Sequence, residues 1–366
     1  MKKSLIYVGL DVHKNSIVIA MATRSDGAVV VRTIPNDGAM LWKVLGELGA
    51  TQRLRVCYEA GPTGYGLARR LNAWGVCCIV IAPSRIPREP GQRVKTDRRD
   101  ARKLANLLRA GLLTEVKIPA AETEAMRDLE RARDDAKNAE RAVRHQLDKF
   151  LLRHGRSWSK TKWTRLHWSW IKQQAFPAEA SRRVLADHMR AVEEATARIE
   201  RLEKDIEELV ETWSLAPLVR ALQALRGIRL ISAVIVAAEL GDVAQFIAAR
   251  KAMAFLGQVP SEDSSGERRR QGRITRTGNG HVRRILTEAA WNYRFQPRPS
   301  RAIRKRRESL PPEIVRIAEK AEQRLSRRFR HLVDKGKSSP KAVAAVAREL
   351  TGFVWAIARE VRSQAA

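Results

Sequence analysis

The sequence predicts an α/β domain at the N-terminus, a pair of long helices in the middle and a mostly helical C-terminal region. Three observations lead to this division. Short apolar or β-branched runs fill residues 1–117, apolar side chains at helical spacing dominate residues 118–215, and basic helical segments make up residues 216–366. With 366 residues and 44% hydrophobic content, the chain can form two or three domains with substantial cores.

The first region begins with three short strands, and Asp26-Gly27 between the second and third is a strong hairpin signal. Helices and strands then alternate up to a loop at 83–90 and a closing helix. Three antiparallel strands followed by alternating helices and strands is the ribonuclease-H order, in which the first strand is central. Strands are expected at 6–11, 16–22, 28–34, 54–59 and 76–81, and helices at 39–48, 65–74 and 98–109.

Two long amphipathic helices are expected in the middle region, within 125–150 and 185–213, because apolar residues recur there at spacings of three and four. Such helices pack as an antiparallel coiled coil or across a dimer interface. Basic residues interleaved with tryptophans separate them. These aromatic side chains either stack on unpaired bases or cap the helix pair as a small core. The tryptophans are Trp158, Trp163, Trp168 and Trp170.

The third region contains a helix–hairpin–helix at 222–240, a device for non-specific binding of a nucleic-acid backbone, and ends in an amphipathic helix at 340–361. Between them, residues 255–260 are a stop signal, and a polar, Gly-containing segment follows. Residues 267–307 hold fourteen Arg or Lys against two Glu, so we expect phosphate contact there. The expected nucleic-acid-binding residues are Arg268, Arg269, Arg270, Arg273, Arg276, Arg283 and Arg284.

The charge and cysteine content restrict the partner and the cellular setting. A net charge of +30 would make the chain repel itself unless a polyanion neutralised it, so nucleic acid is the expected partner. Cys57, Cys77 and Cys78 are too few for a disulfide framework and are expected as reduced core thiols. Because no membrane-spanning run or signal peptide is recognisable, we expect a cytoplasmic protein of bacterial type that associates with the nucleoid when bound to DNA.

Four acidic residues are the candidate metal ligands and catalytic groups. Asp11 and Glu59 lie where apolar strands end, and Asp97 and Asp100 lie three apart where a helix begins. If that helix docks on the sheet, the carboxylates can hold two Mg²⁺ ions, which lie about 3.5–4 Å apart in two-metal phosphodiester cleavage. Taken singly, Glu59 also fits a solvent-exposed strand end and Asp97 a helix N-cap. Their joint occurrence in this strand order favours the metal site.

Several sequence blocks resemble a known family. Residues 8–14 (VGLDVHK), 59–65 (EAGPTGY) and 95–101 (KTDRRDA) resemble the signature blocks of the DEDD insertion-sequence transposases, whose N-terminal domain is similar to the Holliday-junction resolvase RuvC. Further blocks resemble that family's C-terminal transposase domain, in the same order, over nearly the whole chain. They are LGQVPS at 256–261, SSG at 264–266, RITRTGN at 273–279 and HVRRIL at 281–286.

This resemblance implies more than the residues show by themselves. Its members are similar in being guided by a structured bridge RNA whose loops pair with donor and target DNA. They are thought to assemble as tetramers, as a dimer of dimers, so that the acidic domain of one subunit meets the serine of another. The resemblance assigns metal binding to the four acidic residues and nucleophilic attack to Ser265. One departure is Arg229, where the family's turn has a second glycine, which puts phosphate binding at that turn in doubt.

The residues themselves also favour Ser265. Its hydroxyl is expected to be accessible in a Gly-flanked loop, with the arginines at 268–270 able to hold phosphate nearby. A serine–phosphate ester conserves bond energy for rejoining a strand, which hydrolysis does not. Ser264 is the alternative nucleophile. His13 and His281 fit polar surface positions and are given no chemical role.

The expected function is therefore an RNA-guided, magnesium-requiring recombinase that excises and inserts its own mobile element through a serine–DNA intermediate. The nearest rival is a two-metal nuclease or junction resolvase of the same fold that uses water. An ATPase of the actin and sugar-kinase branch also begins with a glycine–aspartate strand, but small phosphate-wrapping residues are missing after Asp11. A non-enzymatic RNA-binding protein is the last alternative, and it would need no carboxylate cluster.

Overall fold

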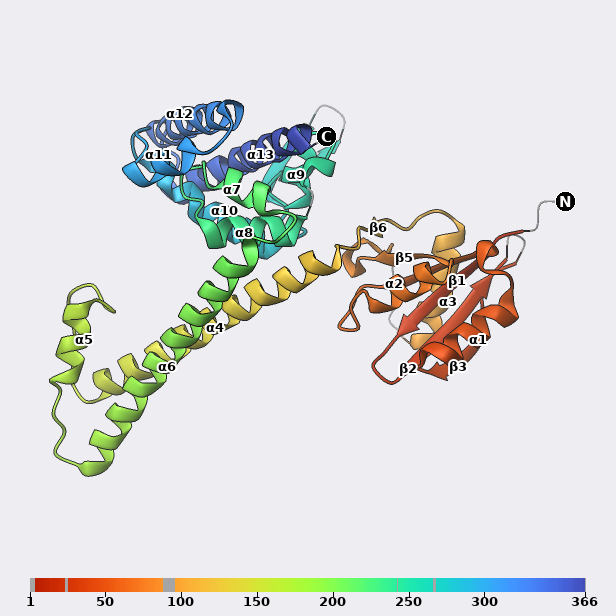
Figure 1. Ribbon diagram of the computed structural model, residues 1–366, viewed down its shortest axis with the longest axis horizontal. Coiled ribbons are helices and arrows are strands. Elements are labelled where there is room, and N and C mark those ends of the chain that lie inside the picture. Colours follow the sequence, from red (N-terminus) through yellow and green to blue (C-terminus); the bar gives the residue numbers. More distant parts are fainter. Residues whose placement is uncertain (1–3, 24–25, 88–95, 242, 266–267, 366) are drawn as a thin grey trace. The chain divides into compact units, whose positions relative to one another are not determined.

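The structure, a computed structural model, describes all residues except 1–3, 24–25, 88–95, 242, 266–267 and 366. The chain divides into two compact units, Met1–Pro119 and Ala120–Ala366 (Figure 1). The expected division of the second unit into two domains stays a prediction. None of the helices within the described ranges is long and apolar enough to cross a membrane.

The first unit is built on a six-stranded sheet in the order β3-β2-β1-β4-β5-β6, so the expected central position of β1 is confirmed. β1 pairs antiparallel with β2 and parallel with β4, and β5 pairs parallel with β4. The two-residue β6 was not foreseen, because so short a strand carries no alternation pattern. The strands are β1 (Ile6–Val12), β2 (Ser16–Ala22), β3 (Val29–Pro35), β4 (Leu54–Glu59), β5 (Cys77–Ile81) and β6 (Glu115–Val116).

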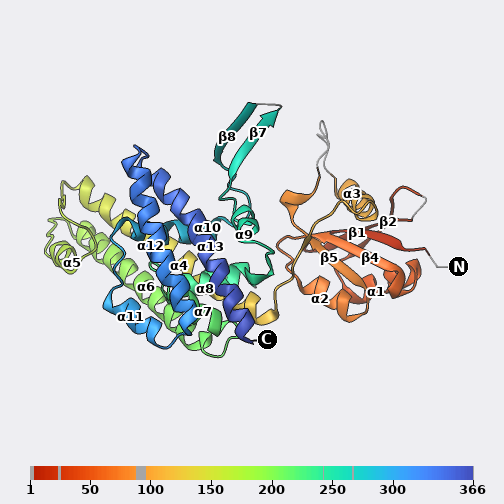
Figure 2. The ribbon, with the colours of Figure 1, turned by 90° about the horizontal axis from the view of Figure 1, so that it is seen from above.

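Helices cover both faces of this sheet (Figure 2). α1 (Gly38–Leu48) and α2 (Gly66–Ala73) pack on one face, where Leu10 and Tyr58 are fully buried. α3 (Asp97–Arg109) packs on the other face, and its small residues Ala101 and Ala105 lie against β2. Residues 88–95, which include the end of the expected loop, lie outside the described residues.

The two expected long helices are α4 (Ala121–Arg153) and α6 (Glu179–Val210), which run side by side in opposite directions (Figure 1). Leu147 of α4 and Ile206 of α6 are fully buried, as their spacing predicted. The predicted apolar stripe on α4 was wrong in part, because Ala125 and Ala139 are exposed. Carboxylates occupy the inner face as well, since Glu130 and Glu140 on α4 are buried.

The tryptophan segment between these helices forms a small core. Trp163, Trp168 and Trp170 pack against buried Phe150 and its apolar neighbours, and α5 (Arg165–Lys172) carries two of them. Trp170 also stacks on the ring of a histidine that is almost completely buried. Of the two interpretations left open by the sequence, the geometry supports the core.

Most of the remaining helices contribute to one core with the adjoining ends of α4 and α6. α8 lies in its centre and is buried from Ala233 to Leu240. The turn before it contains Gly227 at φ +84°, where a Cβ would lie 2.5 Å from the carbonyl oxygen of Ala289, so this glycine serves contact with α10. The remaining helices are α7 (Ala216–Leu222), α8 (Leu230–Leu240), α9 (Ala249–Phe255), α10 (Gly280–Ala290), α11 (Arg301–Glu308), α12 (Pro312–Asp334) and α13 (Ser339–Ala365).

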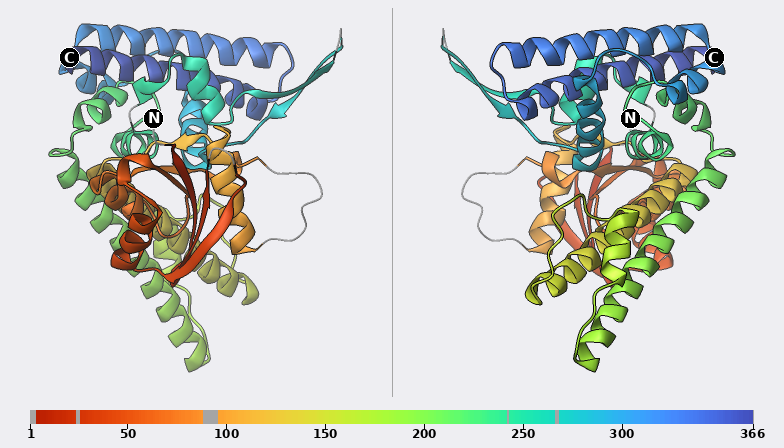
Figure 3. Two further views of the ribbon diagram at one scale, coloured as in Figure 1. Left: turned by 90° about the vertical axis from the view of Figure 1, so that its right-hand side faces the viewer. Right: turned by 90° about the vertical axis from the view of Figure 1, so that its left-hand side faces the viewer.

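A two-stranded hairpin interrupts the helices of the second unit. β7 (Pro260–Ser265) pairs antiparallel with β8 (Arg268–Ile274), and the hairpin, in teal, stands out from the helices of its unit (Figure 3). The expectation of a loop here was wrong. Both strands are polar on both faces and pack on no core, so the alternation that identifies a half-buried strand is missing.

Candidate active site

The acidic site forms where β1 runs beneath α3. A Cβ at Gly9 would overlap the carbonyl oxygen of Ala101 and lie 2.5 Å from the backbone nitrogen of Ala105. α3 can therefore cross β1 at this point only because position 9 has no side chain. Side chains alternate along a strand, so Asp11 leaves the sheet on the same face as Gly9. The close approach brings the end of β1 to the first turn of α3.

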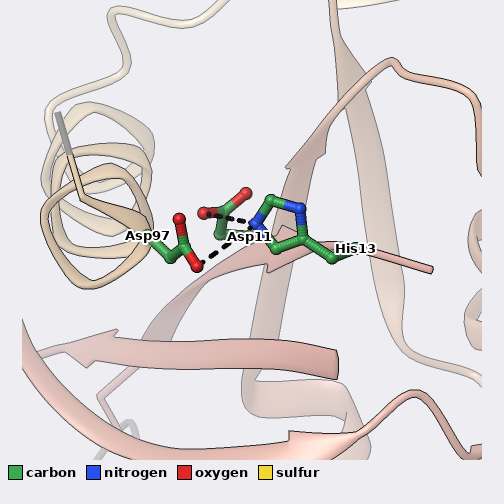
Figure 4. A group of neighbouring side chains, drawn as sticks. All are labelled: Asp11, His13 and Asp97. Atoms are coloured by element: carbon green, nitrogen blue, oxygen red, sulfur yellow. Dashed lines mark hydrogen bonds and ion pairs between the residues drawn. The ribbon is translucent and has the colours of Figure 1, made fainter. Parts of the chain in front are cut away.

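Asp11, His13 and Asp97 meet there as a tight group (Figure 4). The Nε2 atom of His13 lies 3.3 Å from Oδ2 of Asp11 and 3.5 Å from Oδ2 of Asp97. The nearest ligand atoms of the three residues all lie within 4.8 Å of one another. The Asp11 side chain is 19% exposed, whereas the other two are open to solvent. An incoming phosphodiester could thus reach the group.

The electrostatics of this group fit a divalent cation. Burial raises the pKa of Asp11; His13 opposes this rise, while the charges of Asp97 and Asp100 add to it. Ionisation of Asp11 therefore costs free energy, and a bound cation would offset this cost. Carboxylate oxygens are the ligands that hard divalent ions prefer, and an imidazole is compatible with several of them.

Asp100 and Glu59 lie outside the tight group of three but on the same side of the sheet. Asp100 is in the first turn of α3 and near enough to raise the pKa of Asp11. Leu10 and Tyr58 are register partners in the parallel pair of β1 and β4, so Asp11 and Glu59 are the next residues at the same sheet edge. Strand alternation directs both toward the α3 face. Glu59 itself is exposed.

His13 is the member of this group to which the sequence analysis gave no role. Only Val12 lies between Asp11 and His13, and this spacing of two places both side chains on one face when the chain is extended. That signal was present in the sequence. The contact with Asp97 was not visible, because it depends on how closely α3 docks over Gly9.

Ser265 lies at the described end of β7, where it is exposed and pairs in register with Arg268. The hydroxyl of the neighbouring Ser264 donates a 3.1 Å hydrogen bond to Glu262 on the same strand. Residues 266–267, between the two strands, lie outside the described residues. The structure thus gives Ser264 a hydrogen-bond acceptor and leaves Ser265 exposed at the end of β7.

Comparisons with known proteins bear on both sites. Residues 219–304 match the profile of the transposase IS116/IS110/IS902 family, and residues 8–155 match the DEDD transposase profile of IS110 type. A putative transposase y4qE of Sinorhizobium fredii (strain NBRC 101917 / NGR234) is 44% identical over 360 residues, which cover 97% of this chain and 89% of that protein. The chain belongs to the IS116/IS110/IS902 family of transposases.

Two further relatives of the transposase agree. The transposase for insertion sequence element IS1533 of Leptospira borgpetersenii is 33% identical over 341 residues, 92% of this chain and 99% of the relative. A probable family 20 transposase of Pseudomonas aeruginosa is 30% identical over 243 residues, 64% of this chain and 70% of the relative. The protein is thus an enzyme that cleaves and rejoins DNA, and DNA is its partner. The ATPase and the non-enzymatic RNA-binding protein are excluded.

Each matched region of the transposase contains one of the two sites. The DEDD match includes the strands and helix that position Asp11, Glu59, Asp97 and Asp100, and the second match includes Ser265. The matches assign no role to an individual residue. The acidic group and the serine therefore remain candidates supported by geometry and chemistry.

The predicted arginines of the transposase fall into two groups. Arg283 donates hydrogen bonds to the carbonyl oxygens of Leu256 and Thr277, and Arg284 pairs with Asp134 at 2.7 Å, so the fold itself engages both. Those on or beside the hairpin are exposed and remain the better candidates for phosphate contact. They are Arg268, Arg270, Arg273 and Arg276; the side chain of Arg269 lies outside the described residues.

Proposed function

We propose that this transposase excises and inserts its own mobile element under the guidance of a bridge RNA, with Mg²⁺ at the acidic group and Ser265 as the attacking nucleophile. The observation that carries the proposal is the docking of α3 over Gly9, which brings Asp97 of a distant segment beside Asp11. The strand order, with three antiparallel strands and a central β1, supports a ribonuclease-H or RuvC-like fold for the first unit.

Asp11, Glu59, Asp97 and Asp100 would hold the metal, two Mg²⁺ ions on our proposal. Bound Mg²⁺ lowers the pKa of a coordinated oxygen nucleophile and offsets charge on the non-bridging phosphate oxygens. The chain's own contribution is to hold carboxylates from β1, β4 and α3 at one edge of the sheet. Nε2 of His13 donates to Oδ2 of Asp11 and lies 3.5 Å from Oδ2 of Asp97, so this imidazole would orient both carboxylates.

The Ser265 hydroxyl would attack the phosphodiester and form a serine–phosphate ester, releasing the other DNA end as a free hydroxyl. Attack of that hydroxyl, or of another, on the ester would rejoin a strand and restore the serine. Exposure of Ser265 at the end of β7 supports this role, as do the exposed arginines on the neighbouring strand. Ser264 is the less favoured nucleophile because its hydroxyl is already bonded to Glu262.

The partners on this proposal are donor DNA, target DNA and a structured guide RNA, bound by a homotetramer built as a dimer of dimers. The net charge of +30 supports a large polyanionic partner. Ser265 and the acidic group belong to different compact units, and both must reach one phosphodiester. A tetramer in which different subunits supply the two groups meets that requirement. A cytoplasmic protein associated with the nucleoid is the corresponding location.

A nuclease or Holliday-junction resolvase that uses water is the second candidate. It is favoured by one observation, namely that the acidic group is assembled within the first unit without any contribution from Ser265. Both candidates require the same carboxylates, so substitutions at the acidic site do not separate them. Only the covalent step does.

The decisive test is the covalent adduct. Wild-type protein with guide RNA and end-labelled DNA is expected to give a labelled protein band on a denaturing gel, and peptide mapping should place the DNA on Ser265. Ser265→Ala is expected to abolish this band while it retains binding of RNA and DNA, because only the hydroxyl is removed. Ser264→Ala is the matched control and should still form the adduct.

Two results would contradict the proposal. An adduct that maps to Ser264 would reassign the nucleophile. Efficient cleavage by Ser265→Ala, without any adduct in the wild type, would establish the water-using nuclease instead.

A further inference from the structure

A second group of ionisable side chains is buried in the second unit. Glu130 of α4 is 0% exposed, and the side chain of Glu239, at the end of α8, is 2% exposed. Both meet the first turn of α10. Burial of carboxylates is costly unless each is paired, so the contacts of this group need an explanation.

Glu239 holds the N-cap of α10. It accepts hydrogen bonds of 2.6 and 3.1 Å from Arg131 and one of 2.6 Å from Nδ2 of Asn279. Asn279 in turn accepts from the backbone nitrogen of Val282 and so caps the helix. Burial favours the neutral form of Glu239, but Arg131, Arg127 and Asn279 outweigh it and lower the pKa. Glu239 is therefore an anion that orients the capping amide.

Glu130 contacts His281, which lies two residues after Asn279 in the same turn. Its Oε2 atom lies 3.0 Å from Nε2 of His281, whose other ring nitrogen faces Asp134 at 3.8 Å and Arg284. The hydrogen bond that Nε2 of His281 donates to Glu130 raises the pKa of His281. Oε1 of Glu130 is buried without a hydrogen-bond partner among the described residues. A buried ion pair often adds little stability compared with apolar side chains of the same volume, so stability alone does not account for this one.

The turn that these carboxylates hold is continuous with the hairpin that bears Ser265. β8 ends at Ile274, and only 275–279 separate it from α10. This connection is bonded to the start of β7, because the backbone nitrogen of Thr275 donates to Val259 and that of Arg276 donates to Gly257. A Cβ at Gly278, where φ is +69°, would overlap the carbonyl oxygen of Phe255. The base of the hairpin is thus tightly packed.

We propose that Glu130 and Glu239 are positioning residues for the Ser265 hairpin. By holding His281 and Asn279, they fix the first turn of α10 and, through the packed connection, the base from which β7 and β8 extend. This inference rests on the proposed function only in that Ser265 is taken as the nucleophile. α4 follows directly after the first unit in the chain, so this contact also links that helix to the hairpin.

The test uses full-length protein with guide RNA. Glu130→Gln keeps the size of the side chain but removes the charged acceptor of His281. We expect adduct formation to fall at least about tenfold, since a shift of about 1 Å at a reacting group can lower the rate about a hundredfold. RNA and DNA affinity should stay within about twofold, because the exposed arginines are unchanged. Backbone amides at 257–259 and 274–278 should exchange hydrogen faster than in the wild type.

Glu140→Gln is the matched control. Glu140 is a buried carboxylate on the same helix, but its partners Lys137, Arg144 and Thr196 lie on α4 and α6 rather than at α10. It reports the effect of losing a buried charge on α4 without touching the hairpin base. We expect its adduct yield and its exchange at the hairpin base to match the wild type.

A pH profile separates positioning from simple stabilisation. The raised pKa of His281 means that its cation, and the contact with Glu130, persist below that pKa and are lost as the pH rises through it. The charged groups that face His281 are Glu130 and Asp134 on α4 and Arg284 on α10, and Glu239 on α8 interacts with Glu130. In Glu130→Gln, the alkaline loss of adduct formation should therefore move to lower pH. Glu140→Gln should keep the wild-type profile.

The outcomes are distinguishable from failure of the proposed function. If the wild-type protein forms no adduct, or forms it on another residue, the proposed nucleophile fails. Faster hydrogen exchange at the hairpin base in Glu130→Gln would still show that Glu130 holds the hairpin base. If the wild-type adduct lies on Ser265 but Glu130→Gln forms it at the normal rate with unchanged exchange, the positioning role is overturned. Equal losses in Glu130→Gln and Glu140→Gln would reduce Glu130 to a stabilising residue.

Discussion

At the scale of single residues, the acidic site depends on Gly9, a residue without a side chain. Gly9 gives α3 the space to approach the sheet, and Asp11 follows it on the same face of β1. The carboxylate is then placed beside Asp97 and near Asp100, where its charge is unfavourable unless a cation joins it. Binding a cation would neutralise the repulsion between these carboxylates and so stabilise the folded protein.

Asp11→Asn tests this directly. We expect DNA cleavage to fall at least about a hundredfold, because an amide oxygen is a poorer ligand for Mg²⁺ and metal stabilisation of the transition state is worth several kcal/mol. The increase in melting temperature that Mg²⁺ produces in the wild type should disappear, while RNA binding should remain. Glu47→Gln, at an exposed carboxylate paired with Arg32, is the control and should behave as the wild type. Full cleavage by folded Asp11→Asn would remove the metal assignment.

The sequence predicted which residues stand at the acidic site better than it predicted their contacts. Strand ends and a helix start can be recognised from local pattern, so Asp11 and Asp97 could be named. His13 was passed over because its neighbour across the fold is 84 positions away and no local rule records it. His281 was passed over for the same reason, since its partner Glu130 is on another helix.

At the scale of elements, the helix pair presents apolar surface that the chain itself does not cover. Leu209 of α6 is 51% exposed, although its spacing in the sequence assigned it to the buried seam, and Leu202 is half-buried. Val210 takes the buried place instead. Large apolar side chains left open on one face of a long helix are typical of contact with another subunit.

Leu202→Asp combined with Leu209→Asp should therefore dissociate the higher oligomer and abolish recombination together. A carboxylate at a subunit contact loses its water, at a cost of several kcal/mol per ion, which corresponds to at least about a hundredfold in the dissociation constant. Light scattering coupled to size exclusion measures the mass, and circular dichroism confirms folding. Leu209→Asp alone, at the more exposed position, should show the same trend.

Arg190→Asp, at an exposed site on the same helix, is the control for added negative charge and should leave the mass unchanged. A monomeric double variant that still recombines DNA would disprove a role for this surface in assembly.

Elements with a buried face were predictable, and the hairpin was not. β1 and β4 are identified by apolar runs, and α4 and α6 by helical spacing, because burial imposes a period on the sequence. β7 and β8 face solvent on both sides, so their sequence records no period. The burial of the two glutamates on α4 was not predicted, because a charged residue at a buried position of the helix interrupts the apolar pattern.

At the scale of the whole molecule, the two candidate sites lie in separate compact units, while the proposed reaction needs both at one phosphodiester. Local sequence patterns predict each site separately, and only the family resemblance implies that the two sites meet. A surplus of 30 positive charges makes nucleic acid a natural scaffold for bringing them together. Mixing two purified variants in vitro tests whether one subunit or two supply the carboxylates and the serine.

Mixing Asp11→Asn with Ser265→Ala should restore adduct formation if different subunits supply the two groups. Each variant alone lacks one group at every site. In randomly mixed assemblies, a site needs its carboxylates from a Ser265→Ala chain and its serine from an Asp11→Asn chain. Each has a chance of about one half, so about a quarter of the wild-type yield is expected when subunits exchange freely. The adduct should form only on the Asp11→Asn chain, which a size tag on either variant reveals. Replacing one partner by the double variant Asp11→Asn with Ser265→Ala should give none, and a mixture that remains inactive despite confirmed subunit exchange would mean that each subunit completes its own site.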